Sequence, residues 1–411
     1  MTATNNQTAI MEKEDKWCAH NYHPLPVVIT KGAGTKLWDV DGNEYLDFMS
    51  AYSAVSMGHS NPRLLKAMTD QASRLTITSR AFYTDKLGGF VEKLCGITGM
   101  DMCIPMNTGA EAVETAVKAA RRWGYRIKGI ADDKAEILVA EGNFHGRTTT
   151  IVGFSSDKEY QKDFGPFDGG FKIVSYGDIE ALKSAITPNT CAFLVEPIQG
   201  EAGIVMPPKG WLKEVQAICK ENNVLLILDE IQTGMARTGK NFCFQHEIDK
   251  PDMLLLGKAL GGGLFPISAC LASKEIMELF EPGSHGSTWG GNPLACAIGL
   301  EALNIMEEEK LAERSWELGN YLMDGLRKMN SEFISGVRGS GLFIALDIDP
   351  DKATAREVCE RLMAKGVLSK ETHATVVRFA PPLIITKTEL DWALEKVSEV
   401  LSEMAQSRAA A

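Results

Sequence analysis

The sequence predicts an α/β protein with a large domain, built on a mostly parallel central sheet, and a smaller α+β C-terminal domain. The first observation is a set of five short apolar runs, at residues 136–142, 191–197, 224–230, 252–257 and 267–273. The second is that segments of helical periodicity alternate with them. The third is a change near residue 291, after which a long helical stretch leads into further strands. Apolar strands that alternate with helices are typical of a parallel sheet covered on both faces.

Length and charge limit the classes of protein to which the chain can belong. Its 411 residues are enough for two domains, which we place at residues 46–290 and 291–411, with residues 1–45 as an N-terminal segment that packs with the smaller domain. The 43 basic and 54 acidic side chains give a net charge of −11, which argues against a nucleic-acid partner bound through phosphate contacts.

The cysteine pattern and the apolar runs bear on the compartment. The nine cysteines are scattered, with no CxxC pair and no histidine cluster beside them, which predicts reduced thiols and no metal site. No apolar run is long enough to cross a membrane, and residues 1–16 have no apolar core of a signal peptide. We therefore expect a cytoplasmic protein without a membrane partner.

The elements of the first 290 residues follow from local signals. Residues up to about Asp15 are predicted to be loosely attached or disordered. Residues 31–48 alternate in polarity on both sides of Asp41-Gly42, which predicts a hairpin. Helices are expected to begin near Ala110 and Trp211, each after a predicted strand or loop.

The C-terminal part is predicted to mix helices and strands. A helix begins near Asn292, and helical periodicity continues to about Met329. Strands are expected at residues 337–348 and 376–382. The last helix begins near Lys387, with Thr388 as its expected N-cap.

Two ionisable residues stand directly after neighbouring apolar runs. Lys258 follows the run at residues 252–257 and precedes three glycines, and Asp229 directly follows the apolar residues 224–228. A desolvated lysine has a lowered pKa and can bond to an aldehyde, whereas a carboxylate can hold a pyridinium nitrogen. Together they predict a pyridoxal phosphate site at the C-terminal ends of the strands. The alternative for Lys258 is a stem that packs on the sheet with its amine in solvent.

The segment at residues 107–111 is expected to start a helix with a capping box between Thr108 and Glu111. The main-chain amides of Gly109 and Ala110 would then lie at a helix N-terminus, where they can bind phosphate. Taken alone, the motif indicates no more than a well-capped helix.

Other polar and aromatic residues supply the remaining parts of such a site. Phe144 can stack on a flat ring, Arg147 can bind a carboxylate, and His145 between them is expected to be a hydrogen-bonded histidine rather than a catalytic one. Glu201 is either solvated, as its glycine-rich loop favours on its own, or paired with a cation. Thr288 can bind phosphate or serve as a turn residue.

The order and wording of these motifs resemble the class III aminotransferases, which act on ornithine, acetylornithine or GABA. The likeness runs from about Trp17 to the last helix and is closest to members that use ornithine. It is carried by DFMSAYSAVSMGH, LTITSRAFY, PMNTG, EGNFHGRT, VEPIQGEAG, DEIQTGMARTG, LLGKALGGG, HGSTWGGNPLACA and VRFAPPL. The resemblance implies the fold type I architecture of pyridoxal phosphate-dependent transferases.

The resemblance also implies a role for each cofactor-binding residue. Lys258 would bond to the cofactor aldehyde and move protons, and Asp229 would pair with the ring nitrogen. Gln232 would bond the ring hydroxyl, and Ile231 and Phe144 would pack on opposite ring faces. The phosphate would be bound by Gly109 and Ala110 and, from the neighbouring subunit of a homodimer, by Thr288.

For the substrate, the resemblance implies that Tyr52 and Arg147 bind the carboxylate end of ornithine and that Tyr83 shapes the pocket for it. Arg378 would bind the α-carboxylate of glutamate or 2-oxoglutarate, and Glu201 would neutralise Arg378 when ornithine is bound. Position 145 departs from the animal ornithine enzymes, which have Trp where this chain has His.

The implied reaction transfers the δ-amino group of ornithine to 2-oxoglutarate and gives glutamate 5-semialdehyde, which cyclises to pyrroline-5-carboxylate, and glutamate. Transamination of acetylornithine or GABA stays open as an alternative. A mutase or decarboxylase on the same scaffold, or a binding protein that has lost its chemistry, fits less well, because Lys258 and Asp229 are both present and Glu201 with Arg378 suits an oxo-diacid.

Overall fold

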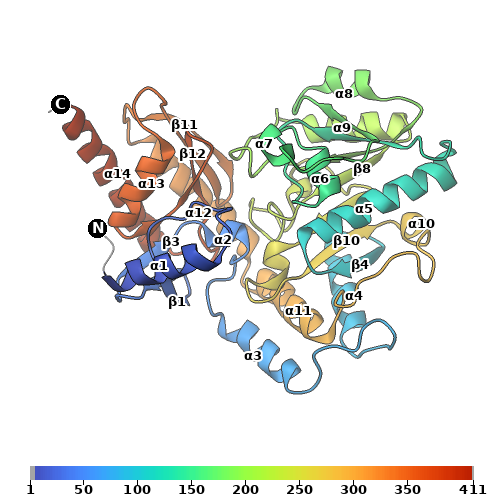
Figure 1. The fold of residues 1–411 in the computed structure, drawn as a ribbon, viewed down its shortest axis with the longest axis horizontal. Helices are drawn as coiled ribbons and strands as arrows, with labels where there is room; N and C mark the ends of the chain where they lie inside the picture. The colour runs from blue at the N-terminus through green and yellow to red at the C-terminus, as the bar shows by residue number, and fades with distance from the viewer. Residues whose placement is uncertain (1–4, 410–411) are drawn as a thin grey trace.

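A seven-stranded sheet forms the centre of the larger part of the molecule in this computed structural model, which describes residues 5–409 (Figure 1). In spatial order its strands are β4 (Met102–Met106), β10 (Ser268–Ala272), β9 (Met253–Leu256), β8 (Leu225–Asp229), β7 (Thr190–Val195), β5 (Glu136–Ala140) and β6 (Phe171–Val174). The five strands predicted from the sequence are all present. Neighbouring strands from β9 to β6 are parallel, whereas β10 runs antiparallel to β9 and β4.

The sheet is buried on both faces, as its continuous apolar runs predict. In β8, Leu225 and Ile227 pack in one cluster with α5 (Gly109–Trp123), whereas Leu226 and Leu228 pack in another with α9 (Trp211–Glu221) and α11 (Pro293–Glu308). Alternate residues of a strand point to opposite faces, so each face needs its own layer of helices. The predicted mostly parallel α/β architecture is confirmed.

The helices around this sheet follow, with their bounds. They are α3 (Pro62–Ala72), α4 (Leu87–Thr98), α5 (Gly109–Trp123), α6 (Thr149–Gly153), α7 (Lys158–Gln161), α8 (Ile179–Ala185), α9 (Trp211–Glu221), α10 (Lys274–Met277) and the short helices η1 (Gly124–Lys128), η2 (Cys243–His246) and η3 (Lys258–Gly261). No helix in residues 5–409 is long and apolar enough to cross a membrane.

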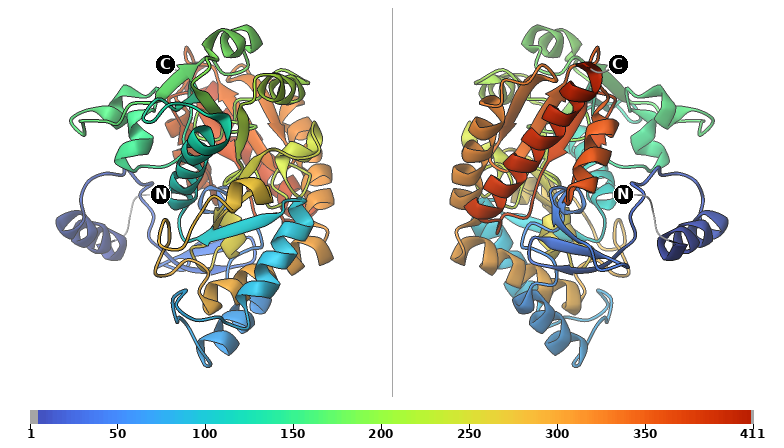
Figure 2. Two further views of the ribbon diagram at one scale, coloured as in Figure 1. Left: turned by 90° about the vertical axis from the view of Figure 1, so that its right-hand side faces the viewer. Right: turned by 90° about the vertical axis from the view of Figure 1, so that its left-hand side faces the viewer.

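The N-terminal segment is helical, where the sequence predicts loose attachment or disorder. Residues 5–15 of that stretch belong to α1 (Asn5–Trp17), which stands apart from the body of the molecule in Figure 2, as loose attachment allows. Its first turn is held because Gln7 Nε2 donates to Asp39 Oδ2 over 3.2 Å and to Asp41. The polar composition of the segment does not reveal these distant partners. Residues 1–4 of the expected disordered stretch lie outside the described residues.

A small sheet follows α1. Strands β1 (Ile29–Ala33), β2 (Lys36–Asp39) and β3 (Glu44–Asp47) are antiparallel, and β13 (Val367–Leu368) from the C-terminal part adds to β3 in parallel. The predicted turn at Asp41-Gly42 is confirmed between β2 and β3, with Gly42 at φ 87°. The pairing of β3 with β13 joins the two ends of the chain.

The C-terminal part contains a four-stranded antiparallel sheet and its helices. The strands, in spatial order, are β11 (Ile334–Ser340), β12 (Phe343–Ile348), β15 (Val376–Phe379) and β14 (Lys370–Thr372). The helices are α11 (Pro293–Glu308), α12 (Leu311–Arg327), α13 (Ala355–Ala364) and α14 (Lys387–Ala409). The predicted long helical stretch is broken into α11 and α12 by Lys310, whose φ is 51°.

The expected cap of the last helix was wrong by two residues. Thr386, not Thr388, caps α14: its hydroxyl accepts from the Glu389 amide over 3.2 Å, and Glu389 accepts from the Thr386 amide over 2.7 Å. This reciprocal pair is a capping box, which needs the acidic residue three positions after the cap.

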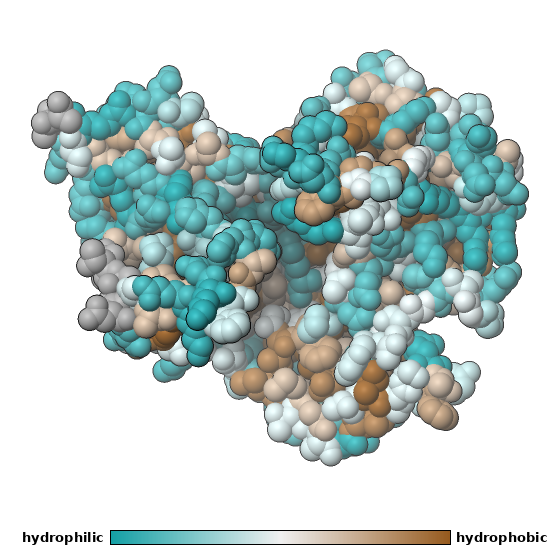
Figure 3. Space-filling model, viewed as in Figure 1, coloured by the Kyte–Doolittle hydropathy of each residue, from teal (hydrophilic) through white to brown (hydrophobic). Residues whose placement is uncertain are grey.

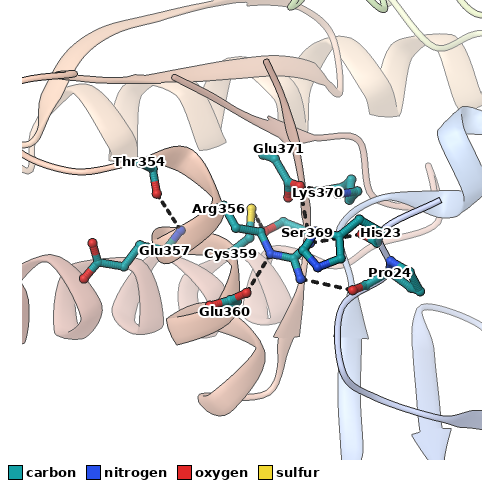
Figure 4. A network of polar contacts seen from close by, with 10 residues as sticks. All are labelled: His23, Pro24, Thr354, Arg356, Glu357, Cys359, Glu360, Ser369, Lys370 and Glu371. Atoms are coloured by element: carbon teal, nitrogen blue, oxygen red, sulfur yellow. Dashed lines mark hydrogen bonds and ion pairs between the residues drawn. The ribbon is translucent and has the colours of Figure 1, made fainter. Parts of the chain in front are cut away.

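Arg356 on α13 fastens the N-terminal segment to the C-terminal part (Figure 4). Its guanidinium donates to the carbonyls of His23 and Pro24 over 3.2 and 3.0 Å. The same guanidinium pairs with Glu360 over 2.6 Å and with Glu371 over 3.4 Å. One side chain therefore holds the chain at residues 23–24 beside β14.

Candidate active site

A cavity opens at the C-terminal ends of β5, β7 and β8. The residues predicted from the sequence that line it are Gly109, Ala110, Phe144, Glu201, Asp229, Ile231, Gln232 and Lys258. Loops that follow parallel strands meet at one edge of the sheet, which is why residues so distant in sequence share this wall.

Lys258 begins η3 directly after β9, with a left-handed φ of 44°. Within residues 5–409 its amine has no hydrogen-bond or ion-pair partner, and it also lines a second cavity beside Thr108 and Gly109. Burial lowers the pKa of Lys258, and the nearby Arg378 lowers it further, against the opposing charge of Glu201. A backbone held in an unfavourable region and an amine with a lowered pKa are features of functional sites.

Asp229 is held from two sides at the end of β8. Its Oδ2 lies 2.6 Å from Nδ1 of His145, and its Oδ1 accepts from the Ile231 amide over 3.0 Å. Burial on its own lowers the pKa of His145, but the hydrogen bond and charge of Asp229 outweigh it, so the pKa is raised. The expectation that His145 is a hydrogen-bonded histidine is confirmed.

Ile231 forms the floor of the cavity, and two glycines make room for it. A Cβ on Gly109 would meet Ile231 Cδ1 at 3.0 Å, and one on Gly257 would meet its Cγ2 at 3.2 Å. Ile231 therefore lies against the start of α5 and the residue before Lys258. The predicted capping box of α5, between Thr108 and Glu111, is present.

A partly buried ion pair lies at one side of the cavity, with side-chain exposures of 6% for Arg378 and 23% for Glu201. Arg378 on β15 donates to Glu201 over 2.8 Å, and Gln232 Nε2 lies 3.3 Å from the same oxygen. Burial raises the pKa of Glu201, but the charges of Arg378 and Lys258 outweigh it and the pKa is lowered. The pairing expected from the family resemblance is therefore present, and the solvated alternative for Glu201 is wrong.

Tyr52 covers this pair from an unusual backbone. Its ring lies under the Arg378 guanidinium, 4.9 Å from the ring centre to Cζ, which is a cation–π contact. The four residues of α2 (Ser50–Ser53) all have positive φ, from 47° to 71°. A left-handed turn without glycine is unfavourable by about 1–2 kcal/mol per residue. The start of this turn is held by Asp47, whose Oδ1 accepts from the Met49 and Ser50 amides over 2.8 Å.

Five predicted residues are not part of the cavity wall: Tyr52 and Arg378, which lie beside it at Glu201, and Arg147, Tyr83 and Thr288. Arg147 is exposed and stacks over Tyr160, with Cζ 4.0 Å from the ring centre. Tyr83 is fully exposed, at 104%, and Thr288 is exposed in the loop before α11. The structure of one chain therefore brings together the cofactor residues and the Glu201–Arg378 pair, but not Tyr83 or Thr288.

Glu196 belongs to the cavity wall and Tyr160 lies outside it beside Arg147; neither residue had a role predicted from the motifs. Tyr160 flanks Arg147, and Glu196 lines the cavity with both oxygens bonded to main-chain amides. A charged residue at the end of an apolar strand, before Pro197, was a signal for Glu196. Nothing in the local sequence distinguishes Tyr160.

A family profile described as Aminotransferase class-III matches residues 17–401. The chain belongs to the class III aminotransferases. An ornithine aminotransferase of Brevibacillus brevis is 57% identical over 401 residues, covering 98% of this chain and 99% of the relative. One of Bacillus subtilis is 57% identical over the same shares.

Solved structures of this class agree with the fold. The ornithine aminotransferase from Toxoplasma gondii has a TM-score of 0.97 at 41% identity and covers 100% of both chains. The acetylornithine aminotransferase from Elizabethkingia anophelis has a TM-score of 0.90 at 50% identity, covering 97% of this chain and 100% of that one. The fold type I architecture expected of a class III aminotransferase is confirmed.

The cofactor of class III aminotransferases is pyridoxal 5'-phosphate, and the Toxoplasma gondii structure holds PLP at its active site. The cavity fits this cofactor. It offers the Lys258 amine, which has no partner among the described residues, and the buried carboxylate of Asp229. It also offers a space bounded by Ile231, beside which Gly109 and Gly257 lack Cβ atoms. The amides of a capped helix N-terminus at Gly109 supply an anion site.

Proposed function

We propose that this enzyme transfers the δ-amino group of L-ornithine to 2-oxoglutarate and produces glutamate 5-semialdehyde, which cyclises to pyrroline-5-carboxylate, and glutamate. The observation that carries the proposal is the partly buried Glu201–Arg378 pair, whose Glu201 lines the same cavity as Lys258 and Asp229. The ornithine aminotransferases that are 52–58% identical over nearly the whole chain support it.

When bound, pyridoxal phosphate supplies an aldehyde that bonds to amines and a ring that accepts electrons from the carbon bearing the amine. Lys258 would hold the aldehyde, and the Asp229 carboxylate would hold the ring nitrogen in its protonated form. Phe144 and Ile231 would flank the ring, Gln232 would bond its hydroxyl, and the amides of Gly109 and Ala110 would bind phosphate.

Lys258 is proposed as the base of the reaction. Because burial lowers its pKa, a larger share of the amine is neutral near pH 7 than for a lysine in water. A neutral amine can take the proton from the carbon that bears the δ-amino group, and the ammonium so formed can return it.

Glu201 and Arg378 allow two substrates of different charge to use one pocket. While they are paired, Arg378 does not attract the α-carboxylate of ornithine into the wrong place. When Glu201 turns away, the free guanidinium binds the second carboxylate of 2-oxoglutarate or glutamate. Tyr52 and Arg147 are proposed to bind the carboxylate end of ornithine.

Tyr83 and Thr288 are proposed to act across the interface of a homodimer, Tyr83 in shaping the pocket and Thr288 in binding phosphate. Both are exposed in the single chain, which is what a contribution to a second copy requires.

We also propose a cytoplasmic location, supported by nine free cysteines. We propose domains at residues 46–290 and 291–411, with residues 1–45 joined to the smaller one.

Acetylornithine is the second candidate amine donor, because the Elizabethkingia anophelis acetylornithine aminotransferase is 50% identical. The deciding experiment gives the purified enzyme ornithine, acetylornithine, GABA or lysine, each with 2-oxoglutarate, and traps the cyclic imine. We expect the highest kcat/KM with ornithine. A higher value with acetylornithine or GABA would replace the proposed donor, and turnover without 2-oxoglutarate would exclude the aminotransferase reaction.

A further inference from the structure

Glu196, the residue directly after β7, is a buried carboxylate that joins two loops of the cavity. Its side chain accepts from the Phe144 amide over 2.9 Å and from the Gly200 amide over 3.1 Å. The residue is only 6% exposed. The first amide belongs to the loop after β5 and the second to the loop after β7, so the two loops share one anion.

The loop at Gly200 is tightly packed against Gln232. A Cβ on Gly200 would lie 1.5 Å from Gln232 Oε1, so no other residue fits without moving that side chain. Gln232 Nε2 in turn approaches Glu201, which is paired with Arg378. A continuous series of contacts therefore leads from the Phe144 amide through Glu196 to the Glu201–Arg378 pair.

We propose that Glu196 is a positioning residue that holds Phe144 on the cofactor side and keeps Glu201 seated on Arg378. It acts through two main-chain amides and does not contact the reacting atoms. The inference rests on the proposed function and deepens it, since it names the residue that holds Glu201 in the position where Glu201 pairs with Arg378.

The surroundings of Glu196 make this support sensitive to protonation. The charged or titratable groups that act on it are His145 and Asp229 from one side, Lys258 across the cavity, and Tyr176, whose hydroxyl donates to the Glu196 carbonyl over 3.3 Å. Burial raises the pKa of Glu196 to about 7, against the opposing charge of His145. A protonated carboxyl has one oxygen that must donate, so it can no longer accept from both amides with full charge.

The test compares Glu196→Gln with a matched substitution, Glu230→Gln. Glu230 is also a buried carboxylate that accepts from two amides, those of Cys243 over 2.5 Å and Phe244 over 2.6 Å, but it does not line the cavity. In both variants one oxygen becomes an NH₂ group that faces an amide donor, so each loses about one hydrogen bond.

The first readout is hydrogen exchange of the Phe144 and Gly200 amides in the complete enzyme, which does not depend on turnover. We expect exchange about tenfold faster at one or both amides in Glu196→Gln and unchanged exchange there in Glu230→Gln. Unchanged exchange at both amides in Glu196→Gln, or equal acceleration in the two variants, overturns the proposal.

The second readout is the rate of each half-reaction in a single turnover, with ornithine or with glutamate. In Glu196→Gln we expect the ratio of the ornithine rate to the glutamate rate to fall about tenfold, because Arg378 is no longer held by Glu201. Glu230→Gln should keep the wild-type ratio. If both variants keep the wild-type ratio, the proposal is overturned. If the wild type and both variants fail to turn over ornithine, but the Gly200 amide still exchanges faster in Glu196→Gln, only the proposed amine donor is rejected.

Discussion

Lys258 shows how much of the site a single position can reveal. Its place between an apolar strand and three glycines predicted a buried amine, and the structure adds a left-handed backbone and the absence of any partner within the described residues. Asp229 was predicted for the same reason, because it ends an apolar strand whose neighbour leads to Lys258. Position along parallel strands was sufficient for both.

Lys258→Ala is expected to abolish the visible absorbance of the bound cofactor and to lower kcat at least 1,000-fold, in the range typical of losing a nucleophile or base. The measurement is the absorbance spectrum of the purified variant beside its turnover. Lys128→Met is the control. Lys128 also has a pKa lowered by burial, but its amine donates to the carbonyls of Thr190, Asn222 and Asn223 at the N-terminal ends of β7 and β8, and it does not line the cavity. Retained turnover in Lys258→Ala contradicts the role of Lys258.

Glu201→Ala is expected to lower kcat/KM for ornithine about tenfold more than kcat/KM for glutamate, because Arg378 then attracts the wrong carboxylate. Both half-reactions are measured by stopped-flow absorbance. Glu301→Ala removes the partner of Arg63, a partly exposed ion pair outside the cavity, and should leave the ratio unchanged. An equal loss for both substrates in Glu201→Ala rejects the switch.

Other residues could not be placed from their own neighbourhood. Tyr83 and Thr288 carry specific motifs, yet both side chains are exposed in the single chain. A sequence motif identifies a residue as part of a site, but it does not indicate whether the residue contributes to the site of its own chain or to that of a second copy. The left-handed turn at Tyr52 was also unforeseen, since the segment contains no glycine to indicate positive φ.

At the scale of elements, strands were predicted better than helices. The central strands are apolar on both faces, a pattern that needs no knowledge of distant partners. In contrast, α1 has few apolar residues and was missed, and the break at Lys310 interrupts a stretch whose periodicity is helical throughout. Both depend on contacts or backbone angles that local composition does not encode.

Glu230, in the loop after β8, is expected to make the free energy of unfolding depend on pH. Burial raises the pKa of Glu230 to about 8 from its ordinary value of 4.5, so the folded protein retains a proton that the unfolded chain releases. The native state binds more protons between these pH values, and the free energy of unfolding therefore decreases as pH rises from 4.5 to about 8.

We expect a smaller decrease of Tm over this pH range in Glu230→Gln than in the wild type, measured by calorimetry in the cofactor-bound enzyme. The slope of Tm against pH reports the titration of Glu230, whereas the lost hydrogen bond lowers Tm by a similar amount at every pH. Glu247→Gln removes a similar pair of amide contacts, to Gly210 and Leu212, from a half-buried carboxylate and controls for that loss. An unchanged slope in Glu230→Gln means that the carboxyl is already ionised in the folded protein.

At the scale of the whole molecule, several large apolar side chains are exposed to solvent in the single chain. Leu75, Phe82, Tyr83 and Trp289 are 39–104% exposed. Figure 3 shows hydrophobic surface on the lower part of the molecule, in the region of α3 and α11. Exposed apolar surface of this kind is typical of subunit interfaces, which supports the proposed homodimer.

Mixing two defective variants tests whether the active site is shared. Lys258→Ala and Thr288→Val are each expected to have low activity at limiting cofactor, but a mixed dimer would carry one site with both intact residues. Activity should therefore rise when the two are unfolded together and refolded with cofactor. Each variant refolded alone is the control. No gain on mixing would place Thr288 in the site of its own chain.

The left-handed turn of α2 has a consequence for how the protein tolerates change. Since each of its four residues adopts an angle that glycine accepts without strain, replacing Ala51 by glycine would favour the folded state locally, the reverse of the usual effect in a helix. The same substitution would widen the range of angles open to the segment. We therefore expect the substitution to loosen the hold on the Tyr52 ring beside Arg378 even though it favours the folded backbone.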